Sequence, residues 1–127
     1  FYKKNLPKSN WKFLKRKKNF MNYQIIDKFD ILVTCESTFG YEAFGRDKKV
    51  AFFAQKITPY EDWRFGWPAN YPKKGLFYSN EISLSEVNRI LDNLIKIKKS
   101  DWKLISIREK KKNMHYDYDN TIIKKYL

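Results

Sequence analysis

The hydrophobic pattern of the chain changes from short apolar runs to longer runs with helical spacing. Residues 31–35 and 50–53 are short runs rich in β-branched and aromatic residues, which predicts two buried strands of a parallel sheet. Between them, residues 39–44 follow a Ser-Thr pair and stop at Gly45, which predicts a short helix. We therefore expect residues 30–53 to form one strand–helix–strand unit whose two strands are adjacent and parallel.

Further elements are expected on both sides of this unit. The strongest is a helix over residues 83–98, because its apolar residues recur at helical spacing and Ser83 and Glu86 stand at the spacing of a capping box. The other expected elements are a helix over 22–29, a short strand over 76–78, a helix from Ser100 to Lys112, and a last helix that begins at Asp119 or Asn120 and runs to Leu127.

The loop between the first strand and its helix contains groups suited to a nucleotide. Ser37 and Thr38 bring hydroxyls to a helix N-terminus, where backbone N–H groups and the helix dipole favour phosphate. Gly40 would let a ligand approach the backbone, and Glu42 could accept hydrogen bonds from the vicinal hydroxyls of a ribose. The plainer alternative is that the hydroxyls only cap the helix and that Glu42 is only a favourable first-turn acid.

Residues 54–75 are predicted to be irregular, because this segment contains three prolines and two glycines. Its aromatic content argues against disorder. Since it follows the second strand, we expect it at the same edge of the sheet as Ser37 and Thr38, as a wall of the pocket. The candidate wall residues are Arg64, Phe65, Gly66 and Trp67. The alternative is a loop packed on its own rings.

The composition adds a strong positive charge and excludes an internal disulfide. The 127 residues have a formal net charge of +13, which would attract an anion, although a general bias toward Lys, Asn, Ile, Phe and Tyr explains most of it. Cys35 is the only cysteine and is expected to be a packed thiol. His115 is the only histidine and has no partner at metal-ligand spacing, so we expect no metal. Residues 1–20 are basic and aromatic, as in a solvated linker or edge segment.

Residues 37–43, Ser-Thr-Phe-Gly-Tyr-Glu-Ala, and residues 45–53, Gly-Arg-Asp-Lys-Lys-Val-Ala-Phe-Phe, together resemble a family signature. It is the STLGYEALARGKKVAFF signature of bacterial surface-carbohydrate biosynthesis proteins, which resemble the nucleotide-sugar-binding half of GT-B glycosyltransferases. Residues 65–68, 74–75 and 116–120 also fit this family. Phe39, Phe44, Gly45 and Asp47 depart from the signature, and Asp47 stands where it has Gly.

The resemblance implies an α/β fold, a three-layer Rossmann-like domain with a parallel sheet. Residues 21–127 would be half of a GT-B fold and the C-terminal part of a longer protein. In that fold Ser37, Thr38 and the backbone of Phe39 and Gly40 would hold the donor phosphates, and Glu42 would hold the ribose. No general base is identified, because in GT-B enzymes it commonly comes from the other half.

The implied function is sugar transfer from a nucleotide-activated donor, without a cofactor, in surface polysaccharide biosynthesis. The partners would be the nucleotide-sugar donor, a saccharide or lipid-linked acceptor and the N-terminal half of the enzyme. The location would be the cytoplasm, with the inner face of the cytoplasmic membrane as a further partner. Two alternatives stay open: a non-catalytic basic module that binds nucleic acid or an anionic membrane, and a nucleotide-sugar-modifying enzyme such as an epimerase.

Overall fold

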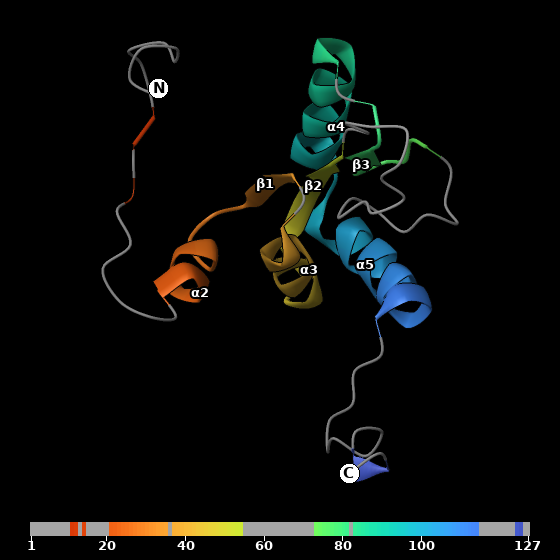
Figure 1. The fold of residues 1–127 in the computed structure, drawn as a ribbon. Helices are drawn as coiled ribbons and strands as arrows, with labels where there is room; N and C mark the ends of the chain where they lie inside the picture. The colour runs from red at the N-terminus through yellow and green to blue at the C-terminus, as the bar shows by residue number, and fades with distance from the viewer. Residues whose placement is uncertain are drawn as a thin grey trace, which may run out of the picture.

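The computed structural model describes residues 11, 12, 14, 21–35, 37–54, 73–81, 83–114, 124 and 125. The elements in these ranges alternate between helices and strands in the first half, and two helices follow the last strand (Figure 1). They are α2 (Met21–Ile26), β1 (Ile31–Cys35), α3 (Thr38–Gly45), β2 (Lys49–Phe53), β3 (Tyr78–Ser79), α4 (Leu84–Lys96) and α5 (Lys99–Asn113).

The three strands form one parallel sheet in the order β1-β2-β3. Leu32 lies opposite Val50 in the first pair, and Phe53 lies opposite Ser79 in the second. The predicted strand–helix–strand unit is therefore confirmed, because β1 and β2 are adjacent, parallel and joined through α3. Helix α4 lies on one face of the sheet and α3 and α5 on the other, which gives three layers (Figure 1). The fold is α/β, as expected.

The core on the α3 side of the sheet is a cluster of aromatic rings. Phe44 of α3 stacks on Phe77 with 5.3 Å between ring centroids, and it meets Trp102 of α5 edge to face at 5.6 Å. Phe52 of β2 contacts the same Phe44 ring. Aromatic pairs of this kind contribute about 0.5–1.5 kcal/mol beyond the area that they bury. This cluster therefore fixes α3 and α5 against the sheet.

The turn between α3 and β2 is held by Asp47, which has a φ of 62°. This left-handed conformation favours glycine, and Asp is among the few other residues that tolerate it. The Asp47 carbonyl accepts a hydrogen bond from Trp102 Nε1 at 3.1 Å, and its carboxylate accepts from Ser106 Oγ at 2.9 Å and from Lys110 Nζ at 2.6 Å. One residue thus ties the turn to α5, at a position where the related signature has Gly.

The strand predicted over residues 31–35 is present as β1, but it is not buried along its length as predicted. It lies at the edge of the three-stranded sheet, and the Val33 side chain is 51% exposed. Cys35 is also exposed, so the expectation of a packed thiol is wrong. The physical reason is that Val33 and Cys35 point to the face of the strand opposite to that of Thr34, which is buried. Within the described part of the chain α4 packs chiefly over β2, so it does not cover these two side chains.

Several predicted boundaries also shift. The helix expected over 22–29 ends at Ile26, and the strand expected over 76–78 is formed by Tyr78 and Ser79. The helix expected to reach residue 98 ends at Lys96, because Ile97 and Lys98 have extended backbone before α5 begins. His115, the beginning of the last predicted helix and most of residues 1–20 lie outside the described residues.

Candidate functional site

The predicted phosphate loop lies where β1 ends and α3 begins. Ser37 has extended backbone, with φ −118° and ψ 128°, and stands at the N-cap of α3 without a side-chain capping hydrogen bond. Thr38 is the first residue of the helix and is exposed. The Gly40 amide donates to the Ser37 carbonyl at 3.0 Å, so the N–H groups that this end of α3 can offer beside the two hydroxyls are those of Thr38 and Phe39. The role of these groups in binding phosphate stays a prediction.

Gly40 sets how closely the start of α3 approaches the sheet. A Cβ at this position would lie 2.5 Å from Thr34 Cγ2 and 2.9 Å from Phe52 Cε1, and both distances are shorter than ordinary contacts. Only glycine therefore fits without a shift of the Thr34 and Phe52 side chains or of the helix itself. The structure thus gives Gly40 a packing role that the sequence did not predict, and this packing fixes the loop that precedes it.

Glu42 lies on the side of α3 that faces α2. Its carboxylate accepts a hydrogen bond from the Tyr23 hydroxyl, and this bond is the main cause of the raised pKa of Tyr23. The Arg46 guanidinium lies 5.7 Å from the centre of the Tyr23 ring, and the Phe39 ring meets that ring edge to face at 5.8 Å. Glu42, the residue predicted to bind the ribose, therefore has a hydrogen-bond partner within the protein, which the sequence did not indicate.

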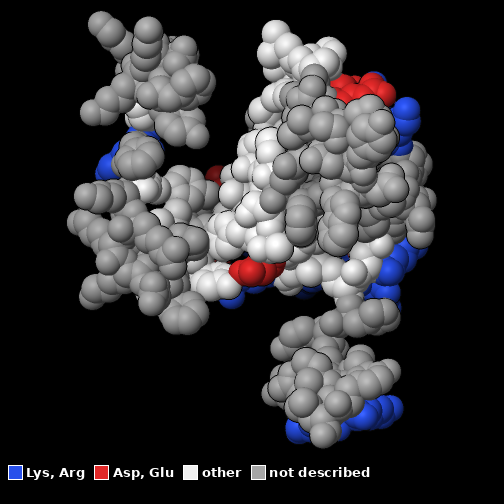
Figure 2. All heavy atoms as spheres, in the orientation of Figure 1, with Lys and Arg blue, Asp and Glu red and all other residues white. Residues whose placement is uncertain are grey.

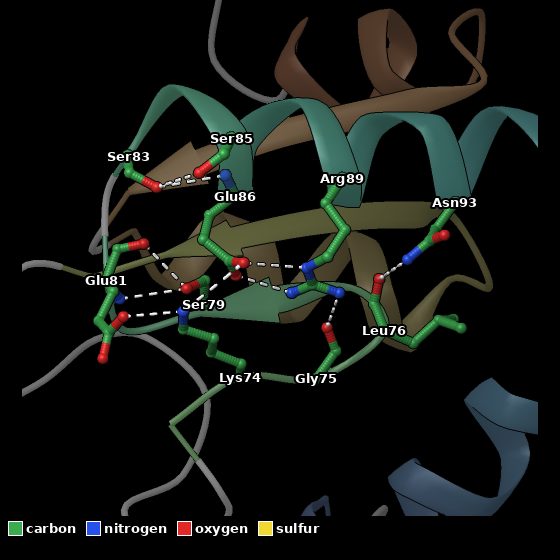
Figure 3. A network of polar contacts seen from close by, with 10 residues as sticks. All are labelled: Lys74, Gly75, Leu76, Ser79, Glu81, Ser83, Ser85, Glu86, Arg89 and Asn93. Atoms are coloured by element: carbon green, nitrogen blue, oxygen red, sulfur yellow. Dashed lines mark hydrogen bonds and ion pairs between the residues drawn. The ribbon is translucent and has the colours of Figure 1, made fainter.

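A polar network surrounds the end of β3 and the start of α4 (Figure 3). Arg89 donates to both oxygens of the Glu86 carboxylate, from Nε at 3.1 Å and Nη2 at 2.8 Å, and from Nη1 to the Gly75 carbonyl at 2.9 Å. These bonds from Arg89 are the main reason why the pKa of Glu86 falls to about 2. The network therefore fastens the segment before β3 to α4.

The sequence indicated only part of this network. Ser83 accepts a hydrogen bond from the Glu86 amide at 3.3 Å, so the predicted cap at the start of α4 is confirmed. The Glu86 carboxylate, however, pairs with Arg89, one turn further along the helix. Lys74 completes the group, with its Nζ 2.9 Å from a Glu81 carboxylate oxygen. Figure 2 shows acidic side chains beside the start of α4 and basic ones along the lower right, over α5.

Arg64, Phe65, Gly66 and Trp67 lie outside the described residues. Within the described ranges, no three His, Cys, Asp or Glu side chains gather as metal ligands. The helices of those same ranges include none with the length and apolar character needed to cross a bilayer.

These features define a class: an α/β domain in which a hydroxyl-bearing loop joins the end of a parallel strand to a helix. Over residues 1–127 the chain matches a family described as "putative O-antigen biosynthesis protein", and it belongs to that family. No curated protein and no solved structure matches the chain. Membership of this family supports a role in surface-carbohydrate biosynthesis, in agreement with the resemblance of residues 37–53.

Proposed function

We propose that this chain is the donor-binding portion of a glycosyltransferase that takes a sugar from a nucleotide-activated donor. The observation that carries the proposal is the loop of Ser37 and Thr38, which lies between the end of β1 and the start of α3. Parallel α/β sheets bind their ligands outside the carboxyl ends of the strands, and the family supports surface-carbohydrate biosynthesis as the context.

In this proposal the loop binds the diphosphate of the donor. The amides at the start of α3 and the hydroxyls of Ser37 and Thr38 face the phosphates, and they stabilise the charge that develops on the departing nucleotide. Glu42 accepts hydrogen bonds from the ribose hydroxyls. The acceptor, a saccharide or lipid-linked saccharide, and the general base belong to the other half of the same enzyme. The reaction takes place in the cytoplasm, where the donor is the substrate and no cofactor is needed.

The contact between Tyr23 and Glu42 makes the ribose role testable. A bound ribose hydroxyl would share the Glu42 carboxylate with Tyr23 or replace Tyr23 as its donor. If Glu42 only holds α2 to α3, removing the Tyr23 hydroxyl or the Glu42 carboxylate should have the same effect on nucleotide binding. If it holds the ribose, only the change at Glu42 should weaken nucleotide binding.

The test is calorimetric titration of nucleoside diphosphates and inorganic pyrophosphate against wild type and variants of the full-length protein. Glu42→Gln should weaken nucleoside diphosphate binding about tenfold, because a charge-assisted hydrogen bond becomes a neutral one. The affinity for pyrophosphate, which has no ribose, should hardly change. Ser37→Ala combined with Thr38→Ala should weaken binding of both ligands alike.

Tyr23→Phe is the matched control, because it removes the protein partner of Glu42 and leaves the carboxylate in place. It should keep nucleotide affinity at the wild-type level or raise it slightly. Equal losses of affinity in Tyr23→Phe and Glu42→Gln, or no loss in either, would show that the pair is structural and would remove Glu42 from the site.

A further inference from the structure

Three corners of the fold meet at the amino edge of the sheet, the edge where the strands begin. Residues 27–30 join α2 to β1, residues 46–49 join α3 to β2, and residues 96–99 join α4 to α5. A direct contact confirms that the last two corners are close, since Lys49 Nζ donates to the carbonyls of Leu94 and Ile97 at 2.7 and 2.8 Å. The three corners together contain seven basic and three acidic residues, an excess of four positive charges.

The surface at this edge is hollowed. One hollow of about 600 Å³ is lined from all three corners, and a second of about 230 Å³ has only apolar residues in its wall. Phe29 and Ile31 line both hollows, so the two adjoin. The wall of the larger hollow contains four basic and two acidic residues. A hollow with net positive charge beside an apolar one suits an amphiphilic anion, whose charged and hydrocarbon parts need different surroundings.

Two large apolar side chains are exposed among the basic residues. Phe29 is 51% exposed and Ile95 is 67% exposed, and both line the larger hollow. Lys96, Lys98 and Lys99 lie within four residues of Ile95 and are exposed, and Lys96 Nζ lies 3.9 Å from an Asp92 carboxylate oxygen on the same helix. Apolar side chains with lysines beside them are typical of surfaces that lie in the interface of an anionic bilayer. Of the basic residues in these corners only Arg46 is an arginine, and it is paired with Asp27 at 2.6 Å, so bidentate reading of nucleic acid is less favoured.

We propose that the amino edge of the sheet docks on an anionic lipid bilayer. Phe29 and Ile95 enter the boundary between headgroups and acyl chains, and Lys96, Lys98 and Lys99 face the lipid phosphates. In this orientation Ser37 and Thr38, at the opposite edge of the sheet, point away from the bilayer. The inference rests on the amino edge alone and does not depend on the proposed donor site.

The test is co-sedimentation of the full-length protein with vesicles of phosphatidylcholine alone or mixed with phosphatidylglycerol. Wild type should bind only the mixed vesicles, and less at high salt. Changing Lys96, Lys98 and Lys99 to Gln should lower the partition coefficient on the order of a hundredfold, from about tenfold or less for each lysine. The control changes Lys73, Lys111 and Lys112 to Gln, which alters net charge equally at exposed positions outside the three corners. It should lower binding only severalfold.

A second variant separates the apolar contribution from the charge. Phe29→Ser with Ile95→Ser should weaken binding to mixed vesicles about tenfold, and the bound fraction that survives high salt should disappear. Both side chains are more than half exposed, so the fold should persist, which thermal unfolding can verify.

Three outcomes would overturn the proposal. The first is an equal loss of binding in the two triple-lysine variants, which would mean that net charge alone attracts the protein to vesicles. The second is unchanged binding when Phe29 and Ile95 are replaced. The third is tighter binding, at the same salt concentration, to single-stranded RNA or duplex DNA than to mixed vesicles, which would assign the amino edge to nucleic acid.

Discussion

The two edges of the parallel sheet differ in their balance of positive and negative charge. At the carboxyl edge, where the strands end, Glu86 is paired with Arg89 and Lys74 with Glu81. At the amino edge Arg46 is paired with Asp27 and Lys110 with Asp47, but positive charge is still in excess, and Phe29 is exposed among the basic residues. Part of the difference follows from topology, because α3 and α4 start at the carboxyl edge and end at the amino edge, and basic residues are favourable at the C-terminal ends of helices.

Some features of each edge need an explanation beyond the stability of the fold. Lys96, in the last turn of α4, would be favourable in any protein. Lys98 and Lys99, in contrast, stand at the start of α5, where the helix dipole does not favour a positive charge. Exposed apolar side chains among the lysines likewise do not stabilise the end of a helix. In the same way, an N-cap serine would be ordinary, but Ser37 stands at that position without capping the helix. The function proposed for each edge is therefore best tested at residues that depart from their usual structural role.

The largest expected effect concerns the packing that positions the carboxyl-edge loop. Gly40→Ala should lower the free energy of unfolding by about 1–3 kcal/mol, because the new methyl group would overlap Thr34 and Phe52. Gly45→Ala, at the other end of the same helix, is the control. Its Cβ would meet only Met114 Cε at 3.5 Å, so the change should be neutral or stabilise by up to about 1 kcal/mol.

Urea unfolding of both variants measures the difference. Equal stabilities would mean that α3 is free to move away from the sheet near Gly40, and that the loop of Ser37 and Thr38 is not held by packing.

A smaller effect is expected at Asp47, close to the amino edge. Asp47→Ala should cost about 1–2 kcal/mol, since it removes the hydrogen bonds from Ser106 and Lys110 and places Ala in a left-handed conformation. Burial alone would raise the pKa of Asp47, but those two hydrogen bonds, together with the positive charges of Lys110 and Lys103, outweigh it and lower the pKa. Asp47→Gly should cost less, because glycine adopts the left-handed conformation readily.

Thermal or urea unfolding of the two Asp47 variants gives the comparison. Ser106→Ala should destabilise wild type and have little further effect in the Asp47→Gly background. A larger loss in Asp47→Gly than in Asp47→Ala would contradict the role assigned to the φ angle.

The smallest effect is a pH dependence at the carboxyl edge. The pKa of Glu86 is lowered from its ordinary 4.5 to about 2, chiefly by hydrogen bonds from Arg89. Between these values the unfolded chain binds more protons than the folded one, so this stabilisation is present above about pH 4.5 and is lost as the pH falls toward 2. Both Glu86→Gln and Arg89→Met should reduce this loss of stability at low pH. Urea unfolding at several pH values between about 4.5 and 2 measures it. An unchanged slope in both variants would exclude the pair as its source.

The sequence predicted the elements whose signal is local. Residues 31–35 and 50–53 are short, mostly apolar runs bounded by turn residues, a pattern that is consistent with buried strands. Ser83 and Glu86 stand at capping distance, so the start of α4 was also predicted. The place of the Ser37 loop at the end of β1 followed from the same reasoning, because chain order alone puts it there.

The features that could not be predicted depend on neighbours distant in the sequence. The contact of Glu42 with Tyr23 spans 19 residues, and that of Asp47 with Ser106 spans 59. No hydrophobic period or motif spacing encodes such pairs. The exposure of Val33 has the same origin, since an apolar strand looks alike at the centre and at the edge of a sheet.

The position of β1 also has a consequence for how the chain behaves in solution at high concentration. Ile31–Cys35 is an outer strand of the described sheet, and it contains no charged residue, proline or glycine. Natural edge strands commonly use Lys, Pro or bulges to prevent the addition of another strand. β1 has neither Lys nor Pro, so it is the segment of the described sheet where self-association through strand pairing is expected to begin during expression and concentration of the isolated chain.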